Sequence, residues 1–287
     1  MNINEVYVSD CLPFMKGMES GIIDMVLTSP PYDDLRKYDG YSFDFFPIAK
    51  ELYRIMKDGS VMVWVVSDQT LEGSETGESF RQALGFMDVG FKLHDTMIYA
   101  KDPRYAQKSR YGSSFEYMFI LSKGTPKTFN PLMRKTMNRG YDKFVTNRNY
   151  DGELVGRRYT SPDETPLYNI WYYSSGFMKT TKDMEAYEHP AIFPDQLAGD
   201  HILSWSNPGD LVFDPFCGSG TTCKMAKRYG RNYIGCDISE KYVEIARKRI
   251  DKTFTLNVLG DKNGIEAYEE DEYMIKNGNS LEFEEYE

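Results

Sequence analysis

The fold of this chain is decided by the stretch LVFDPFCGSGTT, residues 211–222. Its first three residues are apolar and predict a buried strand, and an acid, Asp214, follows directly. Glycines between a strand and a helix let a ligand approach the backbone closely, and the first turn of the helix offers free N–H groups to an anionic group. The stretch therefore predicts a strand, a ligand-binding loop and a helix in succession.

A second acid ends the next predicted strand, residues 232–236, and Asp237 is well placed there to bind the two hydroxyls of a ribose. A tight turn with a helix cap explains the glycine loop equally well when the loop stands alone, but Asp237 favours a nucleoside cofactor. The pattern GxxxxGK[ST] is absent, which excludes a P-loop, and the glycine spacing differs from the GxGxxG of NAD sites. S-adenosylmethionine, with a ribose and a small zwitterionic end, fits better.

A stiff turn, TSPPY at residues 28–32, ends the apolar run at residues 25–27. Two successive prolines fix two φ angles and remove two N–H donors, so the turn offers carbonyls without competing bonds within the chain. A hydroxyl precedes the prolines and an aromatic ring follows them. Such a cluster can accept hydrogen bonds from an amino group and stack on a flat ring, as chemistry on a flipped-out nucleobase requires.

Strand and helix signals alternate through most of the chain, which favours a parallel or mostly parallel sheet covered on both faces. The apolar patterns predict strands at residues 6–8, 24–27, 61–66, 91–99, 117–121, 211–213 and 232–236, and helices at 12–18, 43–57, 80–87, 194–205, 221–229 and around Val243, Ala246 and Ile250. Residues 125–187 are rich in Asn, Arg, Tyr, Gly and Pro without clear periodicity, and we interpret them as an insertion.

Composition limits the class of protein. No apolar stretch approaches the roughly 20 residues of a membrane helix, and the first residues lack a signal-peptide pattern, so we expect a soluble protein of the cytoplasm without a membrane partner. The four cysteines have no CxxC spacing and there are three histidines, which argues against a zinc site and favours reduced thiols.

The net charge of −10 is unevenly distributed. Residues 260–287 hold ten acidic and two basic side chains, whereas residues 101–158 hold thirteen basic and five acidic ones. A basic middle and an acidic tail are compatible with phosphate binding at one face only. We interpret the tail as a solvated appendage, with internal competition against DNA as the alternative.

These residues resemble a known family, the amino-directed DNA methyltransferases of the β class, in which the catalytic motif precedes the cofactor motif. Residues 28–32 look like the catalytic [DNS]-P-P-[YFW] motif, and residues 214–222 look like the D-P-F-x-G-S-G-T-T cofactor loop. The resemblance covers residues 5–124 and 188–252. It implies an α/β, Rossmann-like class I S-adenosylmethionine-dependent fold, with a mostly parallel seven-stranded sheet, helices on both faces and an inserted target-recognition region.

The resemblance also implies roles for individual residues. In catalysis, the exocyclic amine of the flipped base would bond to the Ser29 hydroxyl and the Pro30 carbonyl beside Pro31, and Tyr32 would stack on the ring. The residues expected to bind the cofactor are Asp10, Cys11, Thr28, His189, Asp214, Phe216, Cys217, Gly218, Ser219, Gly220, Thr221, Thr222, Asp237 and Ile238. A structural histidine beside Pro190 is as good an interpretation of His189 as a cofactor contact.

By the same resemblance, residues 1–124 are a catalytic half, 125–187 the target-recognition insertion, 188–254 a cofactor-binding half and 255–287 an acidic tail. The partner is double-stranded DNA, and a cognate restriction endonuclease and a homodimer stay open. The candidate DNA contacts are Arg134, Lys135, Arg139, Lys143, Arg148, Arg157 and Arg158. Each alone is an ordinary surface charge, but interleaved with aromatic and amide side chains they predict a DNA-facing surface.

The motif leaves two target bases open. Ser29 in the first position of the motif is typical of cytosine-N4 enzymes and Asp of adenine-N6 enzymes, so we favour N4-methylcytosine over N6-methyladenine. Methylation at ring carbon 5 needs a cysteine nucleophile, usually after a proline, and no Pro-Cys dipeptide occurs. A DNA-binding regulator without turnover also stays open, as does a methyltransferase acting on RNA or on a protein glutamine, although those enzymes usually place the cofactor loop first.

Overall fold

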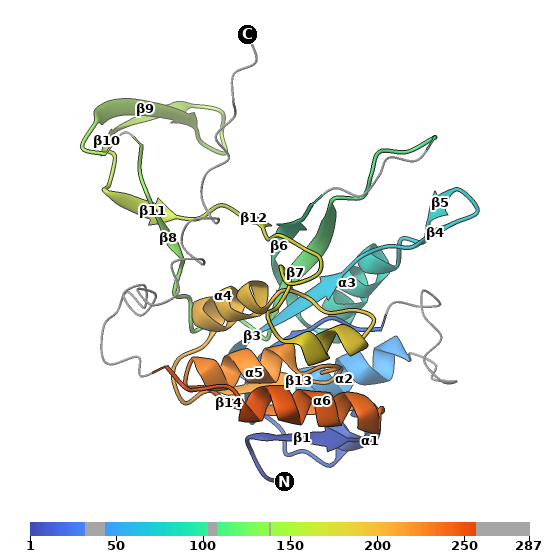
Figure 1. The fold of residues 1–287 in the computed structure, drawn as a ribbon. Coiled ribbons are helices and arrows are strands. Elements are labelled where there is room, and N and C mark those ends of the chain that lie inside the picture. The colour runs from blue at the N-terminus through green and yellow to red at the C-terminus, as the bar shows by residue number, and fades with distance from the viewer. Residues whose placement is uncertain (32–43, 103–107, 138, 257–287) are drawn as a thin grey trace. The chain divides into compact units, whose positions relative to one another are not determined.

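A computed structural model of the chain describes residues 1–31, 44–102, 108–137 and 139–256 (Figure 1). Within these residues the central sheet has eight strands. In spatial order they are β1 (Glu5–Val8), β14 (Asn232–Asp237), β13 (Leu211–Asp214), β2 (Ile23–Thr28), β3 (Met56–Val66), β7 (Phe115–Ser122), β6 (Lys92–Ala100) and β12 (Ile170–Tyr172). β7 runs antiparallel to both neighbours and the other pairs are parallel.

The predicted α/β class with a mostly parallel sheet is confirmed, but the expected seven strands are one too few. The additional strand, β12, comes from the predicted insertion and pairs in parallel with β6. With three residues and two exposed side chains it carries no apolar run that periodicity could detect.

Helices cover both faces of the sheet (Figure 1). Side chains of α1 (Cys11–Lys16), α2 (Phe45–Ile55) and α3 (Glu78–Val89) share one buried cluster, and those of α4 (Asp195–Trp205), α5 (Thr221–Arg228) and α6 (Glu240–Asp251) share the other. Successive β3 residues alternate between the two clusters, which explains its uninterrupted apolar sequence. Each fully buried large apolar side chain contributes about 1.5–3 kcal/mol, so these two layers hold the sheet in place.

The predicted helices are present, and their ends differ by a few residues from the sequence patterns. α1 begins at Cys11 because the Asp10 carboxylate caps it, accepting from the Leu12 amide at 2.8 Å. α2 passes directly into β3 at Met56, so the strand is longer than the apolar run at residues 61–66. No helix in the described ranges is both long and apolar enough to cross a membrane.

Residues 131–168, as far as they are described, form a second compact unit. It contains two antiparallel pairs, β8 (Met133–Lys135) with β11 (Glu164–Pro166) and β9 (Asp142–Arg148) with β10 (Leu154–Thr160). The sequence predicts no helix or strand in this segment, and the structure shows four short strands there. Their side chains are mostly exposed on both faces, so no apolar alternation marks them in the sequence.

Candidate cofactor and catalytic site

The site is built where four neighbouring parallel strands end. β1, β14, β13 and β2 are adjacent and parallel, so their carboxyl ends meet at one edge of the sheet. In register, Val8 of β1 faces Asp237, and Asp214 faces Gly235 of β14. In open α/β sheets ligands bind outside the carboxyl ends of the strands, which makes this edge the natural place for a site.

The stiff turn that begins at Thr28 (the proline turn) and the loop of residues 214–222 (the glycine loop) meet at this edge. The Thr28 hydroxyl donates to an Asp214 carboxylate oxygen at 2.6 Å, across 186 positions of sequence. Beside it, the Thr222 hydroxyl donates to the Leu27 carbonyl at 3.1 Å. Two motifs from opposite ends of the chain are therefore joined directly by side chains.

Asp214 organises the start of the loop. Its side chain is buried, and the oxygen that accepts from Thr28 also accepts from the Phe216 amide at 3.1 Å. Burial raises the pKa of Asp214 to about 6, and the hydrogen bond from Thr28 opposes the rise. Both Thr28 and Asp214 are fully enclosed, so they can shape a cofactor pocket through the backbone that they hold.

At two positions of the glycine loop, Gly218 and Gly220, there is no space for a side chain. Gly218 and Gly220 have φ of +47° and +80°, a region that other residues rarely adopt. A Cβ on Gly220 would lie 2.6 Å from the Ala246 Cβ of α6, and one on Gly218 would lie 2.8 Å from the His189 Nε2. His189 thus lies against the loop, and its ring packs nearly perpendicular to Tyr242 at 4.4 Å between centroids.

Asp237 faces the loop from the end of β14. Its carboxylate accepts from the Gly218 amide at 3.0 Å and from the Ser239 amide at 2.9 Å, and burial raises its pKa. Ile238 follows and is 42% exposed, which leaves an apolar surface at the strand end. The carboxylate and the apolar surface are the two features that a ribose and an attached heterocycle would require.

The first predicted cofactor segment also reaches this edge. The Ser9 amide donates to the Asp237 carbonyl at 2.9 Å, which places Asp10 and Cys11 next to β14. The Asp10 side chain caps α1, and the Cys11 side chain is buried in the apolar cluster that α1, α2 and α3 share. Cys217 lies in the loop with its amide bonded to the Cys236 carbonyl at 3.0 Å.

The catalytic turn follows the last residue of β2. Pro30 is buried, and Ser29 and Pro31 are half-buried beside the Thr28–Asp214 pair. Tyr32 lies outside the described residues. The structure thus places Ser29 and Pro30, the residues expected to accept from the amine, at the edge that carries the glycine loop.

Sequence reasoning missed one residue of this region, Arg249 of α6. Its buried guanidinium donates to the Ser219 carbonyl at 2.6 Å and to the Thr221 hydroxyl at 3.1 Å. The only sequence signal is its place between Ala246 and Ile250 on the apolar face of the helix, where a charged side chain needs buried partners.

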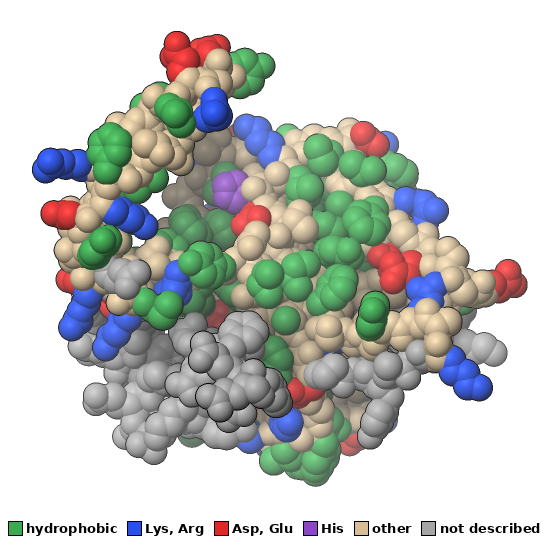
Figure 2. All heavy atoms as spheres, turned by 90° about the horizontal axis from the view of Figure 1, so that it is seen from above, with side chains coloured by type: hydrophobic (Ala, Val, Ile, Leu, Met, Phe, Trp, Pro, Cys, Tyr) green, Lys and Arg blue, Asp and Glu red, His purple; other side chains and the backbone are tan. Residues whose placement is uncertain are grey.

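The predicted DNA contacts lie in the second unit. Lys143 and Arg157 approach the Tyr159 ring at 5.7 and 6.0 Å, and Arg134 stacks on the Tyr168 ring at 4.2 Å. Lys135, Arg139, Arg148 and Arg158 are exposed in the same unit. Lys and Arg side chains are spread along the left of Figure 2, interleaved with apolar ones. Three of the predicted basic residues therefore contact aromatic rings within this unit.

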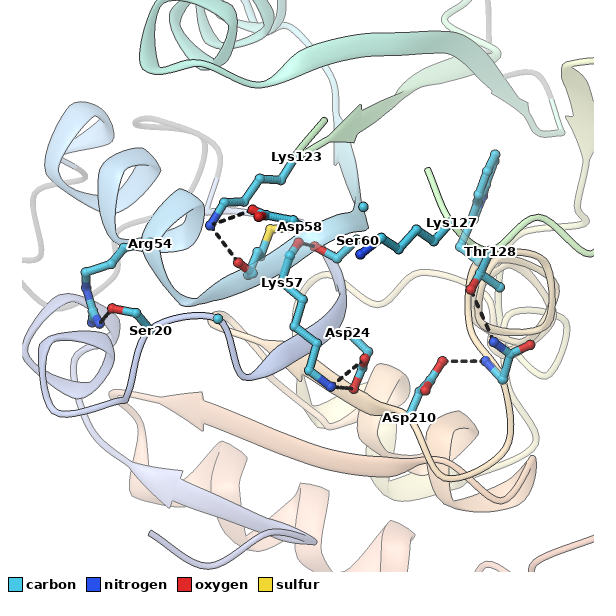
Figure 3. Close-up of a pocket in the computed structure, with 15 residues that line it drawn as sticks. Ser20, Asp24, Arg54, Lys57, Asp58, Ser60, Lys123, Lys127, Thr128 and Asp210 are labelled. Carbon is cyan, nitrogen blue, oxygen red and sulfur yellow. Dashed lines mark hydrogen bonds and ion pairs between the residues drawn. The ribbon is translucent and has the colours of Figure 1, made fainter. Parts of the chain in front are cut away.

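A separate cavity of about 560 Å³ is lined by Ser20 and Asp24 at the amino end of β2 and by no described residue of the catalytic turn (Figure 3). Its cations are largely paired: Lys57 bonds to Asp24 at 2.7 Å, and Lys123 lies 3.6 Å from Asp58. Within the described residues no group of three or more His, Cys, Asp or Glu side chains could hold a metal ion, and all four cysteines are buried thiols.

Comparison with known proteins identifies the class. A model of the DNA methylase family, N6- and N4-directed, matches residues 23–248, a region that includes both the proline turn and the glycine loop. The chain belongs to this family and is an amino-directed DNA methyltransferase, as the resemblance predicted.

Particular relatives agree with this membership. The chain is 53% identical over 242 residues to the orphan methyltransferase M.BamHII of Bacillus amyloliquefaciens, covering 82% of this chain and 91% of that protein. Two solved structures share the fold. The cytosine-N4-specific PvuII DNA methyltransferase has a TM-score of 0.63 at 19% identity, with 92% and 90% of the chains covered. TTHA0409 of Thermus thermophilus, complexed with S-adenosyl-L-methionine, has a TM-score of 0.60 at 19% identity, with 86% and 93% covered.

Proposed function

We propose that the protein transfers a methyl group from S-adenosylmethionine to the exocyclic amine of a flipped cytosine in double-stranded DNA, giving N4-methylcytosine. The observation that carries this proposal is the 2.6 Å hydrogen bond between Thr28 and Asp214. It joins the turn that would hold the amine to the loop that would hold the methyl donor. Holding both reactants in one geometry is a large part of what such a reaction needs.

The loop fits S-adenosylmethionine, which supplies an electrophilic methyl group on a positively charged sulfur. Gly218 and Gly220 leave the backbone uncovered, and Asp237 presents a carboxylate at the adjacent strand end. A carboxylate in this position accepts hydrogen bonds from ribose hydroxyls. Ile238 supplies apolar contact for the adenine ring.

Ser29 and Pro30 act on the amine. The lone pair of an aromatic amine is delocalised into the ring, which makes it a poor nucleophile. Two acceptors, the Ser29 hydroxyl and the Pro30 carbonyl, hold the N–H bonds out of the ring plane and direct the lone pair toward the methyl group. Ser29 need not be a strong base, because the proton leaves as the methyl group arrives.

The preference for cytosine rests on Ser29, which occupies the position where adenine-N6 enzymes typically carry Asp. N6-methyladenine is the alternative within the same family. The recognition surface is the β9–β10 hairpin, because a two-stranded ribbon fits the major groove of B-DNA. Lys143, Arg157 and their neighbours supply the phosphate and base contacts.

The test is to incubate the protein with mixed-sequence duplex DNA and S-adenosylmethionine, digest the DNA to nucleosides and identify methylated species by mass spectrometry. We expect N4-methyldeoxycytidine as the product. The Ser29→Ala variant is the control and should form much less of it. N6-methyldeoxyadenosine instead would establish the alternative base. Cofactor binding without product on any DNA would favour a regulator that retains the fold.

A further inference from the structure

The guanidinium of Arg249 lies inside the protein, where an isolated charge would be costly. Its side chain is 1% exposed, yet it belongs to α6, which is otherwise an amphipathic surface helix. Two carboxylates neutralise it: its Nε donates to Asp183 at 2.7 Å and an Nη donates to Asp195 at 3.1 Å. A buried cation is tolerated only with such compensation, so the two acids belong to the arrangement.

Lys224 of α5 completes the charge balance. Its ammonium lies 2.8 Å from Asp183 and 2.7 Å from Asp195, so two cations and two anions form one closed cluster. Burial raises the pKa of Asp183, but the hydrogen bonds from Lys224 and Arg249 outweigh it and hold that pKa below its usual value. Asp183 is therefore ionised at neutral pH, and hydrogen bonds hold the four side chains in one arrangement.

The remaining donors of Arg249 point to the glycine loop. One Nη donates to the Ser219 carbonyl at 2.6 Å, to the Ser219 hydroxyl at 3.0 Å and to the Thr221 hydroxyl at 3.1 Å. These acceptors flank Gly220, which α6 also touches through Ala246. The helix therefore fixes the loop both by hydrogen bonds and by steric contact.

The same cluster reaches the segment that follows the second unit in sequence. Asp183 belongs to this segment, and the Thr181 hydroxyl donates to the Asp195 carboxylate at 2.6 Å. Arg249 thus lies where three parts of the chain meet: the glycine loop, the start of α4 and residues 181–183. A lysine could not replace it, because one ammonium cannot reach both acids and the loop at once.

We infer that Arg249 is a positioning residue that holds the glycine loop, through Ser219 and Thr221, in the conformation that binds the methyl donor. The inference rests on the proposed cofactor role of that loop. Arg249 touches neither substrate in this scheme, and its effect passes through the backbone on either side of Gly220. Loss of the guanidinium removes the hydrogen bonds to Ser219 and Thr221, which makes the loop more mobile and weakens cofactor binding. The chemistry at Ser29 and Pro30 is unchanged once the cofactor is bound.

The test compares Arg249→Gln with Lys248→Gln, which removes a positive charge from the exposed face of the same helix. We expect Arg249→Gln to raise the calorimetric Kd and the KM for S-adenosylmethionine about tenfold or more, with kcat at saturating cofactor and the KM for DNA within about twofold of wild type. Lys248→Gln should match wild type. A folded Arg249→Gln protein with wild-type cofactor affinity overturns the inference.

Arg249→Lys keeps the charge and guards against an Arg249→Gln variant that does not fold. We expect an intermediate Kd, about fivefold above wild type, because lysine lacks the planar fork. We also expect faster amide hydrogen exchange at residues 216–221 than in wild type. Unchanged affinity and exchange in this variant contradict the role. Wild-type protein that binds no S-adenosylmethionine would instead refute the proposed function.

Discussion

At the scale of single residues, the hydroxyl of Thr28 stabilises a carboxylate in the core. Asp214 is buried at the end of β13, and the hydrogen bond from Thr28 opposes the effect of burial on its pKa. A bond to an ionised acceptor is stronger than one to a neutral acceptor. The contribution of Thr28 to stability should therefore depend on whether Asp214 is charged.

Thr28→Val should lower the free energy of unfolding by about 1–2 kcal/mol at pH 8, where Asp214 is ionised. At pH 5, below the pKa of about 6, the loss should be smaller because the carboxyl group is already protonated. Urea unfolding at the two pH values measures the difference. Thr96→Val, on an exposed position of β6, is the matched control, and equal losses at both pH values would contradict the coupling.

Asp237→Asn should raise the Kd for S-adenosylmethionine about tenfold, because a charged acceptor for the ribose hydroxyls is lost. Isothermal titration calorimetry checks this value directly. Asp251→Asn, at the exposed end of α6, removes the same charge without touching the loop and should leave the Kd unchanged. A wild-type Kd for Asp237→Asn would exclude the ribose role.

The sequence predicts those residues whose type is required by a particular backbone conformation or position. Gly218 and Gly220 have positive φ, and Asp237 ends a strand beside them, so motif spacing locates them. Arg249 could not be found in this way. An arginine in an amphipathic helix is ordinarily solvated, and its acid partners stand 54 and 66 positions away in the chain.

At the scale of elements, the sequence predicts the buried strands and misses the exposed ones. β2, β3 and β13 lie inside the sheet with helices on both faces, so they are continuous apolar runs in the sequence. The β9–β10 hairpin is exposed on both faces, and its residues serve solubility or contact rather than a core. Its strands therefore leave no periodic signal, although its basic charge was visible from composition.

The hairpin makes a prediction of its own. Arg157→Ala should weaken binding to all DNA sequences and reduce the slope of log K against log salt by about one, as expected for one lost phosphate contact. Fluorescence anisotropy across a salt series measures the slope. Lys92→Ala, an exposed cation of β6, is the control. A loss confined to one DNA sequence would assign Arg157 to base reading instead.

At the scale of the whole molecule, stability should depend on pH through Asp200. The Tyr173 hydroxyl donates to this carboxyl group at 2.8 Å, and burial raises its pKa to about 7. A pKa above that of the unfolded chain means that the native state keeps a proton that the unfolded state releases. This contribution to stability is full at low pH and is lost as the pH rises toward 7.

Asp200→Asn should therefore be more stable than wild type at pH 8, on the order of 2 kcal/mol, and should differ little from it at pH 4. Chemical denaturation at the two pH values tests this expectation. Asp88→Asn, on the exposed side of α3, should change stability by less than about 0.5 kcal/mol at either pH. An Asp200→Asn variant less stable at pH 8 would show that the ionised carboxylate is needed for the fold.

The order of strands in the sheet also sets when the enzyme can form during translation. β2, which carries the catalytic turn, lies between β3 and β13, and β13 is made only after residue 210. A nascent chain that ends before that point leaves one side of β2 as an unpaired edge, and such edges promote aggregation. The sheet can therefore be completed only after β13 has been synthesised. A chain truncated before β13 is expected to aggregate and to lack the complete site.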